Sequence, residues 1–381
     1  MLRKQLEQAF GFALQEDTFS KAEIARRARY VCVYGLGKYF EDAFLRQNIR
    51  KRFGVTHLCD GNPERREKIR QDKRYEGLSC IAPEEIHLLE DVAVIFMLGD
   101  PRQAMEMVGE SFPLADWYRL IAFNDLILDD IMQAKHGKEM QEEKEAFLHA
   151  FDLLEDDVSR EVFANVFCLR VAPHLAQRKY EDICTLPQYF PKDILPLGED
   201  ECVVDCGAYT GDTLEEFFRT TGGRFERYDA FEMDRENFLH LEGTAGQLSA
   251  ERIHCHPYGV WSRTGTLPYG RMSSSDSYSL FNSRETCEAR VICLDDAFSH
   301  GERITFVKMD IEGAEQAALH GGANVLRKQH PKLAVCVYHR MEDLWQIPNY
   351  IREISGDYRI YLRHHAEFWV SETVCYGVAG G

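Results

Sequence analysis

The chain has 381 residues, 45% of them hydrophobic, and this length predicts two or three domains with cores of their own. Asp and Glu number 63 against 45 Lys and Arg, and the formal net charge of −18 argues against nucleic acid or an anionic membrane as main partner. The 12 cysteines form no C-x-x-C pair, the N-terminus lacks the apolar core of a signal peptide, and no stretch approaches the roughly 18 apolar residues of a membrane span. We therefore expect a cytoplasmic protein with reduced thiols.

The N-terminal third alternates apolar runs with segments of helical periodicity. Residues 1–28 and 38–52 carry apolar side chains at helical spacing, and the runs at 30–34 and 55–59 are typical of buried strands. This alternation predicts a smaller Rossmann-like α/β domain over residues 1–130.

A glycine pair follows the first of these strands. Asp60 lies 25 residues after Gly35, close to the spacing of an acid that binds a nucleotide ribose. The dinucleotide fingerprint also requires a third glycine three residues after Gly37, and this chain has the bulky Phe40 there. We favour a domain that packs, dimerises or shapes an acceptor pocket, with nucleotide binding as the alternative.

The next region is predicted to be mostly helical. Ile121, Leu126 and Phe147 belong to an apolar series at helical spacing, and the polar stretch at 133–144 is expected to be exposed. We interpret residues 131–185 as a helical connector between two α/β domains.

The strongest motif begins with the apolar run at 202–204, which ends in Asp205. Gly207 and Gly211 would let the backbone turn tightly and approach a ligand. Asp212 or Thr213 is placed to cap the helix that follows. Since α/β sheets bind ligands at the carboxyl ends of their strands, this turn is a candidate binding loop.

A second acid-tipped strand lies downstream. The apolar run at 304–309 ends in Asp310 and is followed by Glu312, a glycine and a helix. Two such strands in one sheet would place carboxylates together in a cleft with a strong local field.

Several motifs then occur in the order known from one enzyme family. They are VVDCGAYTGDT at 203–213, Phe231-Glu232, VKMDIEGAE at 307–315, PKLA at 331–334, VYH at 337–339, YLRHH at 361–365 and ETV at 372–374. The chain resembles the FkbM family of S-adenosylmethionine-dependent methyltransferases over roughly residues 186–378. The resemblance implies an α/β domain over 186–381, built on a seven-stranded Rossmann-like methyltransferase sheet.

The resemblance also implies a cofactor site for S-adenosylmethionine. Glu232 lies 27 residues after Asp205, where a carboxylate can accept both ribose hydroxyls. The expected cofactor-binding residues are Asp205, Gly207, Ala208, Tyr209, Gly211, Asp212, Thr213, Glu232, Met233, Gly259 and Asp310.

A long Ser- and Gly-containing segment at 265–291 precedes the second acid-tipped strand. Long ordered connections are often functional, so we predict a β-hairpin insert near the cofactor, with Ser274 and Ser275 as contacts. A plain surface loop is the alternative. The runs at 358–362 and 372–378 are expected to close the sheet as an antiparallel pair.

Methyl transfer to a hydroxyl needs a base to remove the proton. His339 is the first candidate, because an unperturbed histidine titrates near neutral pH, and Asp310 is the second. A metal ion could instead lower the pKa of the hydroxyl. Candidate ligands are Asp310, Glu312, His339 and His364, but each has a hydrogen-bonding role without an ion, so a divalent metal is not expected.

The resemblance implies a methyltransferase (EC 2.1.1 class) that acts on a hydroxyl of a sugar or natural product, with a small-molecule or saccharide acceptor. One alternative is N- or carboxyl-methylation of a peptide or small molecule. Another is a non-enzymatic scaffold, a degenerate methyltransferase fold that retains the cofactor. No nucleic acid or membrane partner is expected, and a homodimer is a possible assembly.

Overall fold

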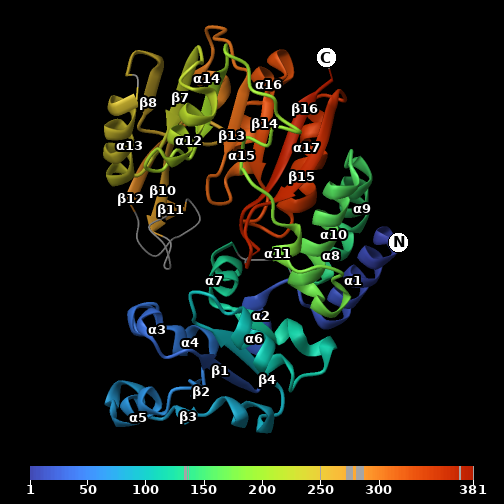
Figure 1. Cartoon of the computed structure of the whole chain (residues 1–381), viewed down its shortest axis with the longest axis vertical. Coiled ribbons are helices and arrows are strands. Elements are labelled where there is room, and N and C mark those ends of the chain that lie inside the picture. The colour runs from blue at the N-terminus through green and yellow to red at the C-terminus, as the bar shows by residue number, and fades with distance from the viewer. Residues whose placement is uncertain are drawn as a thin grey trace. The chain divides into compact units, whose positions relative to one another are not determined.

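The computed structural model describes residues 1–381 except 133, 134, 136, 249, 272–277, 280–286, 369 and 381. The chain folds into two compact units. Unit 1 comprises residues 1–144, 164–181 and 368–370, and unit 2 comprises 145–163, 182–367 and 371–381. Figure 1 shows the elements of each unit coloured along the chain.

Unit 1 contains a five-stranded parallel sheet with the order β3-β2-β1-β4-β5, the arrangement of a Rossmann-like domain. Its strands are β1 (Tyr30–Tyr34), β2 (His57–Cys59), β3 (Ser79–Ile81), β4 (Val92–Phe96) and β5 (Leu120–Ala122). The predicted N-terminal α/β fold is thus confirmed. Ile121 was expected in a helix but lies in β5, because a three-residue apolar strand is too short to show a period of two.

Helices surround the sheet of unit 1. They are α1 (Leu2–Glu16), α2 (Lys21–Arg27), α3 (Lys38–Ala43), α4 (Ile49–Phe53), α5 (Pro63–Gln71), α6 (Arg102–Gly109), α7 (Phe123–Met132), α8 (Gly137–Glu142) and the short 3-10 helices η1 (Lys73–Tyr75), η2 (Pro83–Leu88), η3 (Leu114–Arg119) and η4 (Pro173–Leu175). The single helix expected over 38–52 is interrupted, because Asn48 adopts φ 54° and so leaves the right-handed helical region.

The segment expected as a connector is divided between the two units. It contains α9 (Lys144–Leu153), α10 (Asp157–Val171) and α11 (Tyr180–Ile183), so its predicted helical character is confirmed. The boundary falls within α10, whose residues up to 163 belong to unit 2 and whose residues from 164 belong to unit 1.

Unit 2 is built on a seven-stranded sheet with the order β15-β16-β14-β13-β6-β7-β8. Its strands are β6 (Cys202–Cys206), β7 (Arg227–Phe231), β8 (Ile253–His256), β13 (Phe306–Met309), β14 (Lys332–Cys336), β15 (Tyr358–His364) and β16 (Thr373–Ala379). β16 pairs antiparallel with β14 and β15, and the other pairs are parallel. The predicted closing antiparallel pair is therefore confirmed.

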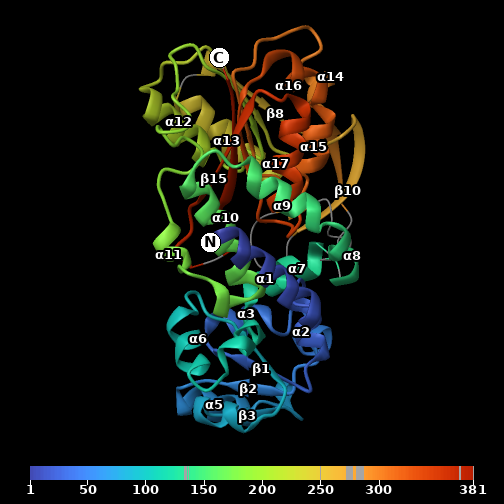
Figure 2. The same ribbon diagram turned by 90° about the vertical axis from the view of Figure 1, so that its right-hand side faces the viewer.

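Helices cover both faces of this sheet, as expected from the central strands β6 and β13, which are buried throughout. Figure 2 shows α12 (Asp212–Thr221) and α13 (Arg235–Leu248) on one face. On the other face lie α14 (Leu294–Ala297), α15 (Glu315–Gly321) and α16 (Ala323–Gln329). This unit also contains α17 (Asp343–Ile354) and η5 (Ala250–Arg252), besides α9 and the first part of α10.

The predicted hairpin insert forms a second, smaller sheet. β10 (Gly265–Arg271) pairs antiparallel with β12 (Cys287–Ile292) and β11 (Tyr278–Ser279), and β12 pairs in parallel with β9 (Gly259–Val260). The hairpin is thereby confirmed, whereas Ser274 and Ser275 lie outside the described residues.

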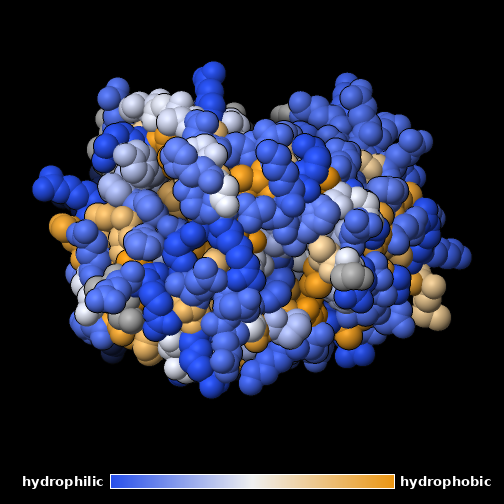
Figure 3. All heavy atoms as spheres, turned by 90° about the horizontal axis from the view of Figure 1, so that it is seen from above, coloured by the Kyte–Doolittle hydropathy of each residue, from blue (hydrophilic) through white to orange (hydrophobic). Residues whose placement is uncertain are grey.

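Hydrophilic residues cover most of the molecular face seen in Figure 3, with smaller hydrophobic patches between them. This agrees with the excess of acidic residues in the sequence. Among the helices that the structure describes, none combines the length and apolar composition that crossing a membrane requires.

Candidate active site

The loop between β6 and α12 is shaped by two glycines. Gly207 and Gly211 adopt φ of 81° and 95°, in the region that favours glycine. A Cβ on Gly207 would lie 1.9 Å from the backbone oxygen of Asp310, so only glycine lets the loops after β6 and β13 approach this closely. Asp212 or Thr213 was expected to cap the helix, but both are helical residues, and Gly211 is the N-cap without a side-chain hydrogen bond.

A buried ion pair at the end of β6 and β13 stabilises this loop. Asp205 and Lys308 are register neighbours on β6 and β13, and Lys308 Nζ lies 3.0 Å from Asp205 Oδ1. Lys308 also donates to the Gly207 carbonyl at 2.7 Å, and the Tyr228 hydroxyl donates to Asp205 Oδ2 at 2.7 Å. Burial disfavours the charged form of Lys308, but Asp205 and Asp310 outweigh burial and raise its pKa. Asp205 thus holds the loop through Lys308.

Glu232, directly after β7, ties two backbone segments together. Its carboxylate accepts from the Tyr209 amide at 3.0 Å and from the Asp234 amide at 2.7 Å. Burial raises the pKa of Glu232 to about 7, against the lowering effect of these hydrogen bonds. The ionised form therefore predominates only above neutral pH.

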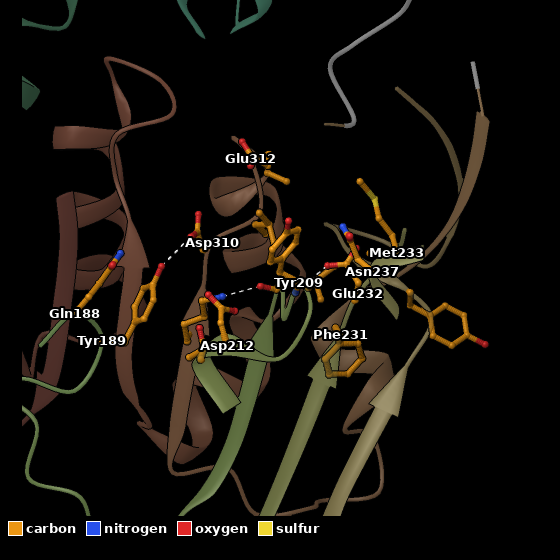
Figure 4. Close-up of a pocket in the computed structure, with 18 of the residues that line it drawn as sticks. Gln188, Tyr189, Tyr209, Asp212, Phe231, Glu232, Met233, Asn237, Asp310 and Glu312 are labelled. Carbon is orange, nitrogen blue, oxygen red and sulfur yellow. Dashed lines mark hydrogen bonds between the residues drawn. The ribbon is translucent and has the colours of Figure 1, made fainter. Parts of the chain in front are cut away.

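A pocket of about 390 Å³ opens at the carboxyl ends of β6, β7 and β13. In Figure 4, Gln188 and Tyr189 lie on one side of it and Glu232 and Met233 on the other. Its lining residues are Gln188, Tyr189, Gly207, Tyr209, Asp212, Thr213, Phe231, Glu232, Met233, Asn237, Tyr258, Gly259, Val260, Lys308, Asp310, Ile311, Glu312, Ala314, Tyr338 and Glu372.

Asp310 is held by hydroxyl groups at the centre of this pocket. Tyr189 donates to Asp310 Oδ2 at 2.8 Å, and Tyr338 donates to Asp310 Oδ1 at 3.1 Å. Burial opposes ionisation of Asp310, but Lys308, His339 and the two hydroxyls outweigh it and lower its pKa. Asp310 is therefore an ionised acceptor at neutral pH.

His339 is 1% exposed and is surrounded by carboxylates. Its Nε2 lies 3.5 Å from Asp310 and 3.4 Å from Glu312, and its Nδ1 lies 3.0 Å from Glu315. Burial disfavours the imidazolium form, but Glu315 and Glu312 outweigh burial and raise the pKa of His339 well above its ordinary value. The expectation of a base with an ordinary histidine pKa therefore does not hold for this environment.

Glu372 also lines the pocket, and Gln188 donates to its Oε2 at 2.6 Å. Burial and the nearby Asp310 raise the pKa of Glu372 to about 7. A carboxyl group that titrates near neutral pH in a pocket is suited to proton transfer.

The pocket gathers many of the residues expected from the sequence. Those that line it are Gly207, Tyr209, Asp212, Thr213, Glu232, Met233, Gly259, Asp310 and Glu312. The remaining expected residues, Asp205, Ala208, Gly211, His339 and His364, are not among the lining residues. His364 is fully buried, and its Nδ1 lies 2.8 Å from Thr373 Oγ1.

Three residues at the site were not nominated from the sequence. Tyr189 precedes the first strand of the domain, Glu372 directly precedes β16, and Glu315 begins α15. Glu315 had been interpreted as an acid that favours a helix N-terminus, yet its side chain is fully buried against His339. Both Glu312 and Glu315 are acids of the motif at 307–315, and the motif does not distinguish them. They differ in burial, because the side chain of Glu312 is partly exposed and that of Glu315 is fully buried.

The strand order of unit 2, with its antiparallel seventh strand and its pocket at the parallel strand ends, defines a Rossmann-like methyltransferase fold. Residues 205–366 match the family model described as the Methyltransferase FkbM domain. The match agrees with the resemblance to the FkbM methyltransferases that the motifs of this segment predicted. No match to a curated protein was found.

One solved structure shares its fold with nearly the whole chain, and two others are similar over about half of it. Methyltransferase FkbM from Methylobacillus flagellatus KT has a TM-score of 0.69 and 24% identity, covering 99% of each chain. Fibrillarin from Aeropyrum pernix, solved with bound S-adenosyl-L-methionine, has a TM-score of 0.33 and 13% identity, covering 49% of this chain and 71% of its own. A putative methyltransferase from Streptococcus mutans in complex with SAH has a TM-score of 0.31 and 10% identity, covering 49% of this chain and 93% of its own.

Proposed function

We propose that unit 2 binds S-adenosylmethionine and methylates a hydroxyl of a sugar or natural product. The observation that carries this proposal is the pocket beside the Gly207 loop, with Glu232 at one end and Asp310 beside it. When bound, S-adenosylmethionine supplies a methyl group that its sulfonium has already activated.

The residues present fit this cofactor. The cavity of about 390 Å³ lies in the range of small-molecule sites. Glu232 keeps lone pairs for ribose hydroxyls beyond the two amide hydrogen bonds it accepts. The lining also carries four further carboxyl groups against one lysine, which suits a cationic sulfonium; these are Asp212, Asp310, Glu312 and Glu372.

For a hydroxyl acceptor, Glu372 is the best-placed base. It lines the pocket, its pKa is close to neutral, and Gln188 fixes one of its oxygens. His339 lies behind Asp310 and Glu312 and is not a lining residue. We therefore infer that Glu372 takes the proton of the acceptor, while His339 orients the two acids in front of it.

The test is transfer of a tritiated methyl group to a panel of saccharides, with amines and acidic peptides assayed beside them. Glu232→Gln should abolish transfer by weakening cofactor binding, and Glu372→Gln should lower the rate about 10²–10⁴-fold while leaving cofactor affinity unchanged. Labelled saccharide that resists alkaline hydrolysis supports ether formation.

The second candidate is methylation of an amine, because the carboxylates of the pocket would also attract a cationic acceptor. Transfer only to amines would favour it, and alkali-labile product on peptides would indicate carboxyl methylation. Tight cofactor binding without transfer to any acceptor would instead support a scaffold.

A further inference from the structure

His339 and Glu315 are two fully enclosed polar residues that take no direct part in the proposed methyl transfer. His339 is 1% exposed, and the side chain of Glu315 beside it is fully buried. Within the described part of the chain, Nε2 of His339 meets no partner with both the distance and the angle of a hydrogen bond, whereas Nδ1 lies 3.0 Å from Glu315. Burying polar atoms in this way is costly unless a bound ligand satisfies them.

Two acids face the Nε2 side of the ring from the pocket wall. Nε2 lies 3.5 Å from Asp310 Oδ1 and 3.4 Å from Glu312 Oε2. These separations exceed those of ordinary N–H···O hydrogen bonds, about 2.7–3.2 Å. They match the spacing of about 3.4 Å between two ligands that each lie about 2.1 Å from a tetrahedral ion.

The other ring nitrogen faces Glu315. Its Oε1 lies 3.0 Å from Nδ1 and also accepts from the Ile311 amide at 2.9 Å, so the carboxylate is fixed in place. A carboxylate on the far nitrogen is the usual device that orients a metal-binding histidine. In the described part of the chain, ligand atoms of Asp310, Glu315 and His339 lie within 4.8 Å of one another, and Glu312 approaches Nε2 at 3.4 Å.

We propose that Asp310, Glu312 and His339 Nε2 bind one divalent transition-metal ion of the Zn²⁺ or Mn²⁺ class, with Glu315 holding the imidazole. One nitrogen and two carboxylate oxygens form a mixed ligand set that these ions accept more readily than Mg²⁺ or Ca²⁺. The ion would add positive charge where three carboxylates converge.

This site deepens the proposed function and rests on it. Asp310 and Glu312 are each 24% exposed in their side chains and line the pocket, so an acceptor hydroxyl can complete the coordination. Binding to the ion lowers the pKa of such a hydroxyl. The proton then passes to Glu372 on the same pocket.

The test uses the full chain after EDTA treatment and dialysis, without S-adenosylmethionine. Titration with Mn²⁺, followed by loss of the free-ion paramagnetic resonance signal, should reveal one bound ion per chain that Zn²⁺ displaces. Glu312→Gln and His339→Gln should each weaken Mn²⁺ at least 10-fold, and Glu315→Gln should weaken it about 10–100-fold. Asp212→Asn removes a charge from the same pocket and should leave Mn²⁺ affinity within twofold.

Circular dichroism of each variant shows whether it folds. If His339→Gln does not fold, Glu312→Gln still tests the metal site, because the side chain of Glu312 is partly exposed. Absence of stoichiometric Mn²⁺ binding, or equal weakening in Glu312→Gln and Asp212→Asn, would overturn the metal site. Calorimetry with S-adenosylhomocysteine on the same preparation separates the two proposals. Cofactor binding without Mn²⁺ binding overturns only the metal site, whereas Mn²⁺ binding without cofactor binding overturns the proposed function.

Discussion

The two units share the strand order 3-2-1-4-5 in their parallel sheets, and each follows its first strand with a glycine turn. In unit 1, Asp60 after β2 accepts from the Leu36 amide and faces Arg65. The cavity beside this turn is about 170 Å³, and Phe40 is buried in the core behind it. In unit 2, the equivalent acid Glu232 reaches a cavity of about 390 Å³.

The shared strand order places a binding edge in each unit, whereas the loop residues decide what that edge can bind. Lys38, Arg65 and Lys68 line the smaller cavity, whereas carboxylates dominate the larger one. Four experiments test this difference between the two units.

The first compares the ion pairs beneath the two turns. Lys308→Met should lower the free energy of unfolding by about 3–5 kcal/mol, because it leaves Asp205 buried without its partner. Arg65→Met should cost at most about 1 kcal/mol, since Arg65 is 52% exposed beside Asp60. Denaturant unfolding followed by circular dichroism measures the free energy of unfolding of both variants. Equal losses in Lys308→Met and Arg65→Met would show that the two ion pairs do not differ in their contribution to stability.

The second compares the glycines. Gly207→Ala should destabilise the protein by about 2–3 kcal/mol, because φ is 81° and the new Cβ would strike the Asp310 carbonyl. Gly37→Ala should change stability by less than about 0.5 kcal/mol, since its nearest neighbour would be an Arg65 atom at 3.8 Å. Thermal unfolding of the matched pair tests this, and a stable Gly207→Ala variant would contradict the close approach of the two loops.

The third experiment measures how the affinity for S-adenosylhomocysteine depends on pH. Since burial raises the pKa of Glu232 to about 7, its carboxyl group is mostly protonated below that pH. If the ionised form binds ribose, affinity for S-adenosylhomocysteine should be about tenfold lower at pH 6 than at pH 8. The Glu232→Gln variant should bind S-adenosylhomocysteine weakly at both pH values. If the affinity of the natural chain did not change with pH, a role of ionised Glu232 in ribose binding would be excluded.

The raised pKa of Glu232 affects folding stability in the opposite direction, because it favours the folded state at low pH. The folded state binds the Glu232 proton more tightly than the unfolded state, whose pKa is near 4.5. Its contribution to stability is therefore fully present below about pH 4.5 and is lost as the pH rises through about 7. Glu232→Gln should flatten the pH dependence of the unfolding midpoint between these values.

Much of unit 2 was predictable because its strands are long apolar runs that end in acids and glycines. The Gly207 turn, Glu232 and Asp310 follow from such local patterns, and the structure places all three at one pocket. We did not predict strand β5, because three apolar residues are too few to show the period of two that is typical of a strand.

Tyr189, Glu315 and Glu372 escaped prediction for a different reason. They reach the site from a segment before β6, from the start of α15 and from the turn before β16. Their importance lies in burial and in contacts with Asp310, His339 or the pocket, which no local spacing encodes.

The most direct test is calorimetric titration of the full chain with S-adenosylhomocysteine. We predict one micromolar site per chain that Glu232→Gln abolishes and that Asp60→Asn, the matched change in unit 1, leaves unchanged. No binding by the natural chain, or binding lost in Asp60→Asn and retained in Glu232→Gln, would contradict it.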